Sequence, residues 1–431
     1  TFTVPSGVTI TNNGTQTGFG REGSVDWQTG SIKTAGFTAT TGEGYFCNTS
    51  GGAFTVALPA GVAGSIVSIA DYTRTFDTDI LTVSPDGSEK IGGIADDVRL
   101  NVAGQSATFV YVDSTEGWIN VQETETSKTG APPFVAATGG TITTCGDYKI
   151  HSFTGPGTFT VSCAGSACGS NTIDYMVVAG GGGGGNGNPS DYAGGGGGAG
   201  GYRESPGAAS GCYTASPLGV SPAAALPVAV AGYPVAVGGG GAGSSTPGGA
   251  AGTSGVDSVF TGTSTITSAG GGGGATAGDP AALDGGSGGG GVASCGEGSG
   301  NTPPVTPPQG TDGGDGVGNA GGGGGGALLA GDDHGAGGLG GNGGGGATSS
   351  ISGSSAARAG GGGGSGYTAP VACGGAGGGG NGADSGATAA TVGIITTGGG
   401  GGGGASIPTH APSGTGAQGG SGIVIIRYKY Q

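Results

Sequence analysis

The chain has 431 residues with a formal net charge of −16, and 118 of its residues are glycine. Only 33% are hydrophobic and 9% are charged, so the apolar side chains are too few to fill a core of ordinary density along the whole chain. The excess of acidic over basic residues, 27 against 11, opposes binding to nucleic acid or to an anionic membrane surface. No apolar stretch approaches the roughly 20 residues needed to span a bilayer, so we expect no membrane insertion.

The N-terminal part predicts β-structure throughout. Short apolar or alternating runs are separated by Gly, Asn, Asp and Pro at the spacing typical of a β-sandwich. These runs lie at 1–4, 8–11, 45–48, 54–58, 66–70, 81–84, 107–112 and 118–121. We divide this part into a β segment over 1–30, a β-sandwich module over 31–126 and a polar, proline-containing linker over 127–139.

A second β unit follows the linker. Strand-like runs occur near 147–153, 158–162 and 173–179, and the last segment, 423–430, is also strongly β-forming. An isolated terminal strand is not stable, so we expect 423–430 to pair with 173–179. Residues 140–179 would then form a β unit completed by 423–431, and 180–422 would be one long glycine-rich insertion.

The insertion contains blocks of four or more consecutive glycines. They lie at 180–185, 194–198, 238–241, 270–274, 288–291, 321–326, 343–346, 360–364, 377–380 and 398–404. A flexible linker is the alternative reading, but residues such as Tyr202, Leu328 and Ile394 interrupt the blocks. Collagen is excluded because glycine does not recur at every third position. We therefore predict a packed bundle of polyglycine II helices.

Such a bundle explains why glycine is required. A polyglycine II helix has no internal hydrogen bonds, so its N–H and C=O groups must bond to neighbouring helices, and a Cβ would hold those backbones apart. Glycines in the middle of the blocks are predicted to be structural. We select Gly182, Gly196, Gly239, Gly272, Gly323, Gly362 and Gly401.

The path of the chain predicts which links lie at the far tip of the bundle. If each block crosses the bundle once and directions alternate, the links at the tip are 186–193, 242–269, 292–320, 347–359 and 381–397. However, 233–237 and 265–269 look like strands that enter the third and fourth blocks from the same end. That arrangement would require an additional return through 242–264.

Several segments together carry a family resemblance. They are 146–151 (GDYKIH), 157–161 (GTFTV), 174–185 (DYMVVAGGGGGG), 200–203 (GGYR) and 421–428 (SGIVIIRY), with 42–46 (GEGYF) and 110–118 (VYVDSTEGW) upstream. The chain resembles glycine-rich virion structural proteins of marine phages or cyanophages, whose architecture is similar to that of phage tail-fibre adhesins. The resemblance implies that 1–30 belongs to a fibre shaft and 31–126 is a fibre module.

The resemblance also implies a location and partners. The chain would lie in the virion tail fibre, form a homo-oligomer with other fibre subunits, with a trimer favoured, and bind a host cell-surface glycan or outer-membrane protein through its tip loops. The candidate contact residues are Tyr192, Pro303, Pro304, Pro307, Pro308, Ser350, Ile351, Asp384 and Ile394. Tyr192, Tyr202 and Tyr367 lie beside glycine blocks and could stack on a sugar, and the alternative is a ring that covers the bundle flank. For the prolines the alternative is a stiff loop without a partner.

Catalytic, cofactor and metal sites are not predicted. Asp332, Asp333 and His334 lack a third carboxylate, and Asp312 and Asp315 form a single imperfect copy of a calcium-binding pattern. No glycine block continues as Gly-Lys-Ser/Thr or lies in a βαβ pattern, which excludes a phosphate-binding loop. Only three histidines are present, and no serine has nucleophile-elbow spacing, so we expect no enzyme and no cofactor.

The cysteines bear on the alternative function, a self-assembling secreted fibril or surface adhesin of a bacterium. Seven cysteines are scattered without a CxxC pair, and only Cys163 and Cys168 are close enough in sequence for a local disulfide. Buried free thiols are expected for a phage protein that folds in a reducing cytoplasm, whereas disulfides would favour the secreted fibril. An ice-binding bundle is a third reading, but it requires a flat and regular face, and the long irregular loops argue against it.

Overall fold

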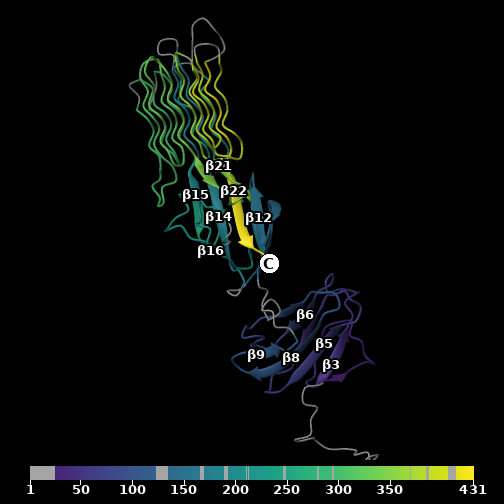
Figure 1. Cartoon of the computed structure of the whole chain (residues 1–431). Helices are drawn as coiled ribbons and strands as arrows, with labels where there is room; N and C mark the ends of the chain where they lie inside the picture. The colour runs from purple at the N-terminus through teal and green to yellow at the C-terminus, as the bar shows by residue number, and fades with distance from the viewer. Residues whose placement is uncertain are drawn as a thin grey trace, which may run out of the picture. The chain divides into compact units, whose positions relative to one another are not determined.

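The computed structural model divides the chain into two compact units, Thr1–Pro132 and Pro133–Gln431 (Figure 1). It describes residues 25–122, 134–165, 169–188, 193–209, 211, 213–245, 249–278, 281–293, 296–368, 370–384, 388–405 and 414–431. These residues contain strands and no helix, so the predicted all-β class is confirmed. The strands predicted at 1–4 and 8–11 lie outside the described residues.

Unit 1 consists of two sheets. One contains β1 (Asp26–Trp27), β3 (Glu43–Cys47), β5 (Ile66–Asp71), β8 (Ser106–Asp113) and β9 (Gly117–Asn120), and the other contains β2 (Phe37–Thr38), β4 (Phe54–Ala57), β6 (Leu81–Ser84) and β7 (Val98–Leu100). From β1 to β6 the chain alternates between the sheets, so β3 pairs parallel with β5 and β4 pairs parallel with β6. The sequence pattern predicted most of these strands and missed β1, β2 and β7.

The core of unit 1 lies between the two sheets. Phe76, Phe109 and Trp118 are fully buried there, and the indole N–H of Trp118 donates to Glu89 Oε2 at 3.2 Å. Cys47 lies in the same core, and burial raises the pKa of its thiol to about 12. This cysteine therefore behaves as a small apolar residue.

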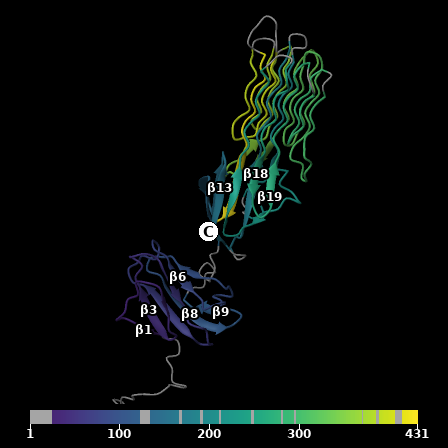
Figure 2. The ribbon, with the colours of Figure 1, turned by 180° about the vertical axis from the view of Figure 1, so that it is seen from behind.

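The β-sheet part of unit 2 also has two sheets (Figure 2). One contains β10 (Val135–Thr138), β13 (Gly157–Ala164), β17 (Ala231–Ala236), β18 (Ser258–Thr261) and β19 (Thr265–Ser268). The other contains β11 (Thr141–Cys145), β12 (Tyr148–Phe153), β22 (Ile423–Lys429), β14 (Thr172–Val178) and β15 (Tyr202–Glu204), with β16 (Leu226–Pro227) paired to β14. We call this part the β base.

The C-terminal strand β22 lies in the centre of its sheet. It pairs antiparallel with β14 from Asp174↔Arg427 to Val178↔Ile423, which confirms the predicted pairing. It also pairs with β12, which the sequence did not predict. Tyr428 Oη lies 3.1 Å from His151 Nε2, and burial lowers the pKa of this histidine, so the imidazole favours its neutral form.

The glycine-rich part consists of extended segments that cross one bundle, and we call them crossing segments. Backbone hydrogen bonds between them define their directions relative to the β base. Those leading away from the base are 179–188, 238–244, 269–277, 287–292, 310–316, 330–335, 359–365, 378–384 and 398–405. Those returning to it are 193–201, 251–257, 281–286, 296–301, 321–327, 340–346, 371–376, 388–394 and 414–422.

The hydrogen bonds of 180–185 repeat every three residues. The N–H groups of Gly180 and Gly183 donate to segment 251–257, those of 181 and 184 to 414–422, and those of 182 and 185 to 193–201. Their C=O groups accept from three further segments in the same rhythm. This is the pattern that a helix with three residues per turn produces, and we interpret the crossing segments as polyglycine II helices.

Block length follows position in the bundle. Six interior segments each bond to six neighbouring segments, and they include all of the glycine blocks of six or seven residues. These interior segments are 179–188, 193–201, 287–292, 321–327, 359–365 and 398–405. Some segments at the edge have glycine mainly where they face the interior. In 310–316, for example, Gly313, Gly314 and Gly316 are buried, whereas Asp312 and Asp315 are exposed.

The structure corrects the predicted chain path. Segment 251–257 returns to the base, as the alternative path through 242–264 required, with Thr253 N bonded to Ala242 O and Val256 N to Gly239 O. Strict alternation of the glycine blocks is wrong, because several crossing segments have no block of four glycines. As a consequence, 292–320 crosses the bundle twice, and 347–359 lies at the β base instead of the far end.

The hairpin of β20 (Ala347–Ser349) and β21 (Ala356–Arg358) connects the near end of the bundle to the β base. Ser349 Oγ donates to the buried carboxylate of Glu204, which also accepts from Tyr202 Oη at 2.8 Å. Burial, and then the charge of Glu204, raise the pKa of Tyr202. These buried polar contacts define how the bundle joins the sheets that hold it.

Candidate functional site

The candidate site is the end of the bundle away from the β base, which we call the outer end. Two of its turns are completely described, 316–320 and 335–339, and each is closed by backbone hydrogen bonds, such as Gly335 N to Leu339 O at 2.8 Å. Together they line a pocket of about 330 Å³ that includes Val317, Asn319 and His334. The Nδ1 atom of His334 is buried and has no hydrogen-bond partner in the described part of the chain.

Tyr367 lies beside this pocket on the next turn. Its backbone N–H donates to Gly338 O at 2.8 Å, and Thr368 Oγ1 donates to Gly337 O at 3.1 Å. The Tyr367 side chain is 46% exposed, and Val317 is 50% exposed. The outer end thus presents the ring of Tyr367 and the side chain of Val317 on its turns, with the imidazole of His334 where segment 330–335 ends.

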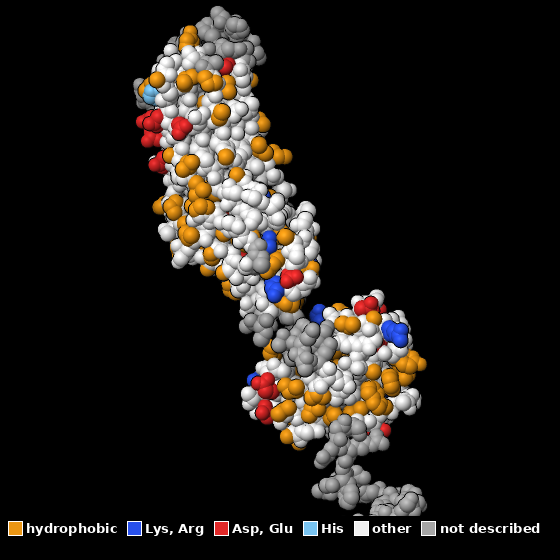
Figure 3. Space-filling view, in the orientation of Figure 1, with side chains coloured by type: hydrophobic (Ala, Val, Ile, Leu, Met, Phe, Trp, Pro, Cys, Tyr) orange, Lys and Arg blue, Asp and Glu red, His pale blue; other side chains and the backbone are white. Residues whose placement is uncertain are grey.

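Charge is unevenly distributed around the bundle. The acidic side chains of Glu297, Asp312, Asp315, Asp332 and Asp333 come from three adjacent edge segments, and Figure 3 shows acidic groups gathered on one flank. A hydrogen bond to Asp315 raises the pKa of the Glu297 carboxyl, and the nearby carboxylates add to this shift. Edge segments 238–244, 388–394 and 414–422, on the other side of the interior segments, contain no charged residue.

Two of these acidic residues, Asp312 and Asp333, have a structural role that Asp284 and two asparagines share. Some backbone N–H groups of an edge segment have no further glycine segment whose carbonyls could accept their hydrogen bonds. A side chain from the adjoining segment accepts these bonds instead. The acceptors are Asp284 for Ser299 N, Asp312 for Gly300 N, Asp333 for Asp315 N, Asn342 for Cys373 N and Asn381 for Gly374 N, at 2.7 to 2.9 Å. Sequence reasoning missed this role. Asp or Asn beside a glycine in segments with short glycine blocks was the available signal.

No metal centre forms among the described residues. No three His, Cys, Asp or Glu side chains come together in a group that could hold an ion. The described residues also contain no helix that could cross a lipid bilayer.

The proline-rich loop predicted as a tip contact lies at the β-base end. Pro303, Pro304, Pro307 and Pro308 occupy the link between segments 296–301 and 310–316, where Gln309 O accepts from Tyr202 N at 2.8 Å. The loop is internally bonded, with Gln309 Nε2 donating to Pro303 O at 2.9 Å. It borders a pocket of about 250 Å³ that includes Arg203 and Asp257.

The other predicted contact residues are divided between the two ends. Ile351 is fully buried at the base, where its carbonyl accepts from Arg427 Nη1 at 3.4 Å, and the adjacent Ser350 bonds to Thr214. Ile394 is 58% exposed on a turn at the same end. Asp384 lies at the outer end but is 94% buried (6% exposed), with its carboxylate accepting from Thr388 N. Tyr192 lies outside the described residues.

The selected glycines differ in the space around them. An ideal Cβ on Gly182, Gly196, Gly272, Gly323, Gly362 or Gly401 would lie between 1.8 and 2.1 Å from a backbone oxygen of another segment. Gly239 is the exception, because a Cβ there would meet nothing within 4 Å. Glycine is therefore required by close approach at the interior positions and not at Gly239.

The fold and this site define an all-β protein in which a glycine-rich bundle, joined by backbone hydrogen bonds, is mounted on β-sheets. The chain belongs to the glycine-rich domain family, whose sequence pattern matches residues 153–429, more than half of the chain. A comparison with curated proteins found no match.

Proposed function

We propose that the chain is a structural fibre protein and host-receptor-binding adhesin of a tailed phage, located in the tail fibre of the virion. One observation carries this proposal: the strands that enter and leave the bundle, β14 and β22, both lie in the base, and the outer-end turns 316–320 and 335–339 lie at the opposite end of the bundle. Loops on a rigid scaffold can vary in sequence without unfolding it, which is the arrangement that recognition requires.

The proposed partner is a glycan or an outer-membrane protein on the host cell surface. The outer-end turns around His334, with Val317 and Tyr367, are our contact surface. The proline-rich loop, Ser350, Ile351 and Ile394 are excluded from it because they lie at the base. In this proposal unit 1 is a fibre module, and the chain assembles with other fibre subunits as a homo-oligomer, with a trimer favoured.

Free thiols among the described cysteines are what the phage proposal expects. Cys47, Cys145, Cys163 and Cys373 are free, and they include one partner of the single local disulfide that the sequence allowed. Cys47 is buried as expected, whereas Cys373 is exposed. An exposed free thiol is compatible with folding in a reducing cytoplasm and is unusual in a secreted fibre.

The test is a cell-binding assay with the full chain. Fluorescently tagged protein is incubated with a panel of bacterial strains, including strains that lack O-antigen or single outer-membrane proteins, and cell-bound fluorescence is measured. The double variant Val317→Asp, Tyr367→Ala is expected to lose binding at least about tenfold, because contact energy is concentrated in a few central side chains.

Leu329→Ser is the matched control, since Leu329 is 64% exposed on a turn at the β-base end. It should bind like the parent, and both variants should melt within about 3 °C of it because surface substitutions change stability little. Equal binding by the double variant would contradict the proposed surface. A chain that binds no strain and instead assembles into filaments would support the secreted-fibril alternative.

A further inference from the structure

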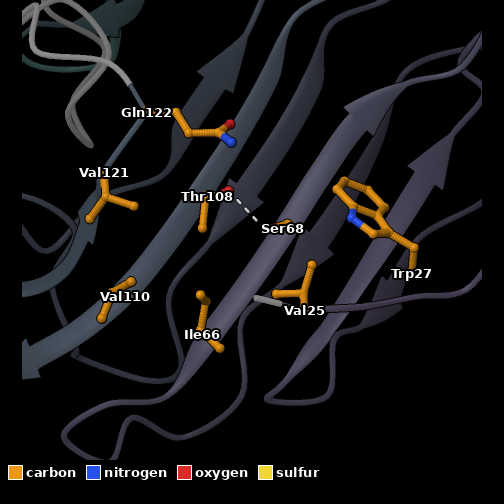
Figure 4. A pocket seen from close by; sticks show the side chains of 8 residues that line it. All are labelled: Val25, Trp27, Ile66, Ser68, Thr108, Val110, Val121 and Gln122. Atoms are coloured by element: carbon orange, nitrogen blue, oxygen red, sulfur yellow. Dashed lines mark hydrogen bonds between the residues drawn. The ribbon is translucent and has the colours of Figure 1, made fainter. Parts of the chain in front are cut away.

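The outward face of the larger sheet of unit 1 contains a concavity unrelated to the two pockets of unit 2. A groove of about 430 Å³ is lined by side chains from β1, β5 and β8 and from the residues that flank β1 and β9 (Figure 4). Ligand pockets in proteins typically have this size and combine an apolar lining with a few polar groups. The lining residues are Val25, Trp27, Ile66, Ser68, Thr108, Val110, Val121 and Gln122, and none of them is charged.

Trp27 forms one side of the groove and is held in place by its neighbours. An ideal Cβ on Gly44 would lie 2.8 Å from Cδ2 and Cε3 of the indole, so the ring packs directly against a backbone that has no side chain. The ring of Phe46 lies 4.9 Å from it between centroids. The indole is still 37% exposed, so it is a fixed aromatic surface that faces solvent.

The floor of the groove contains a buried polar pair with unused hydrogen-bonding capacity. Ser68 Oγ and Thr108 Oγ1 lie 2.8 Å apart and are only 3% and 8% exposed as residues. That bond uses one of their two hydroxyl hydrogens, and neither side chain has another hydrogen-bond partner among the described residues. Gln122 supplies an amide on the side of the groove opposite Trp27 (Figure 4).

We propose that this groove binds a neutral saccharide. The C–H face of a pyranose ring packs on an indole, and its hydroxyls both donate and accept, as Ser68, Thr108 and Gln122 do. A lining without charge offers nothing to a phosphate or a carboxylate. This site is in unit 1, so it is separate from the proposed outer-end surface, and either can fail without the other.

The experiment is a fluorescence titration of the full chain with neutral methyl glycosides of glucose, galactose, mannose and N-acetylglucosamine. The chain has two tryptophans, and Trp118 is fully buried in the core, so a ligand-induced change in emission reports on Trp27. We expect at least one glycoside to shift the emission with a dissociation constant on the order of 1 mM. Trp27→Phe should abolish the change in fluorescence. NMR of the glycoside should then show whether weaker binding to this variant persists.

Gly44→Ala should weaken binding about tenfold or more by displacing the indole, and Gln122→Ala should also weaken it. Tyr72→Ala is the control, because Tyr72 is 56% exposed in unit 1 and does not line the groove; it should bind like the parent. The proposal is overturned if no neutral glycoside binds at tens of mM, if a charged sugar binds better, or if Gln122→Ala and Trp27→Ala leave binding unchanged. Concentration-dependent dimerisation lost in Val121→Asp would instead assign the groove to a second copy of the chain.

Discussion

Gly323→Val is expected to unfold the glycine-rich bundle. A Cβ at this interior position would lie 1.9 Å from Asn342 O, 2.5 Å from Asn342 C and 3.0 Å from Gly343 N. All three atoms are backbone, so no side chain can rotate away, and segments 321–327 and 340–346 must separate. Their separation breaks backbone hydrogen bonds on both sides, and each buried group left without a partner costs about 1 to 3 kcal/mol.

The measurement is thermal unfolding followed by circular dichroism. We expect the transition of unit 2 to fall by roughly 10 °C or more, since each kcal/mol shifts the melting temperature of a domain this large by about 2 to 4 °C. Gly239→Val is the matched control, because its Cβ would meet nothing within 4 Å and the position is exposed. Equal melting of the two variants would show that close backbone approach does not hold the bundle together.

Deletion of residues 423–431 is expected to prevent unit 2 from folding. The deletion removes β22 from between β12 and β14, together with the fully buried side chains of Val424, Ile425, Ile426 and Tyr428. It also frees two sheet edges that would otherwise be paired, and exposed apolar edges promote aggregation. We expect an insoluble product, or a soluble one that protease digests within unit 2.

Deletion of Gln431 alone is the control, because this residue is exposed and follows the last strand. Addition of a synthetic 423–431 peptide during refolding should restore protease resistance to the larger truncation if the strand acts by completing the sheet. A truncated chain that stays soluble and melts like the parent would contradict the central position of β22.

Sequence reasoning succeeded where a local pattern determines the structure. The β-branched run at 423–430 and its counterpart at 173–179 predicted a pairing that the register of β22 and β14 confirms. The alternation at 66–70 and 107–112 likewise predicted strands β5 and β8, which now pair across the sheet. In these cases burial of one face fixes the strand and its orientation.

The path through the bundle could not be predicted in the same way. Segment 251–257 crosses the bundle with only Gly252 and Gly255 facing inward, so a search for consecutive glycines does not find it. A helix with three residues per turn requires glycine on all of its sides only when other segments pack against all of its sides. Edge segments can be found only by searching for glycine at every third position. A search for consecutive glycines missed several of them, and it therefore placed 303–308 and 347–359 at the wrong end of the bundle.

The candidate site was predicted least well. Tyr367 was singled out as a ring that could stack on a sugar, but its proximity to the 335–339 turn depends on contacts between segments distant in sequence. Asp333 resembled part of an ion site, yet its carboxylate accepts from Asp315 N, a bond that exists only because two edge segments run side by side. The roles of Tyr367 and Asp333 depend on which segments lie side by side in the bundle, and the order of residues along the chain does not specify that arrangement.

Amide hydrogen exchange should show whether backbone hydrogen bonds between glycine segments form the interior of the bundle. Each N–H from Gly180 to Gly185 donates to a backbone carbonyl of another segment. Peptides covering 180–185 and 194–198 should therefore exchange only through unfolding of the whole of unit 2, as slowly as β22. Complete exchange of these glycines within seconds, while β22 stays protected, would show that these hydrogen bonds do not form the interior of the bundle.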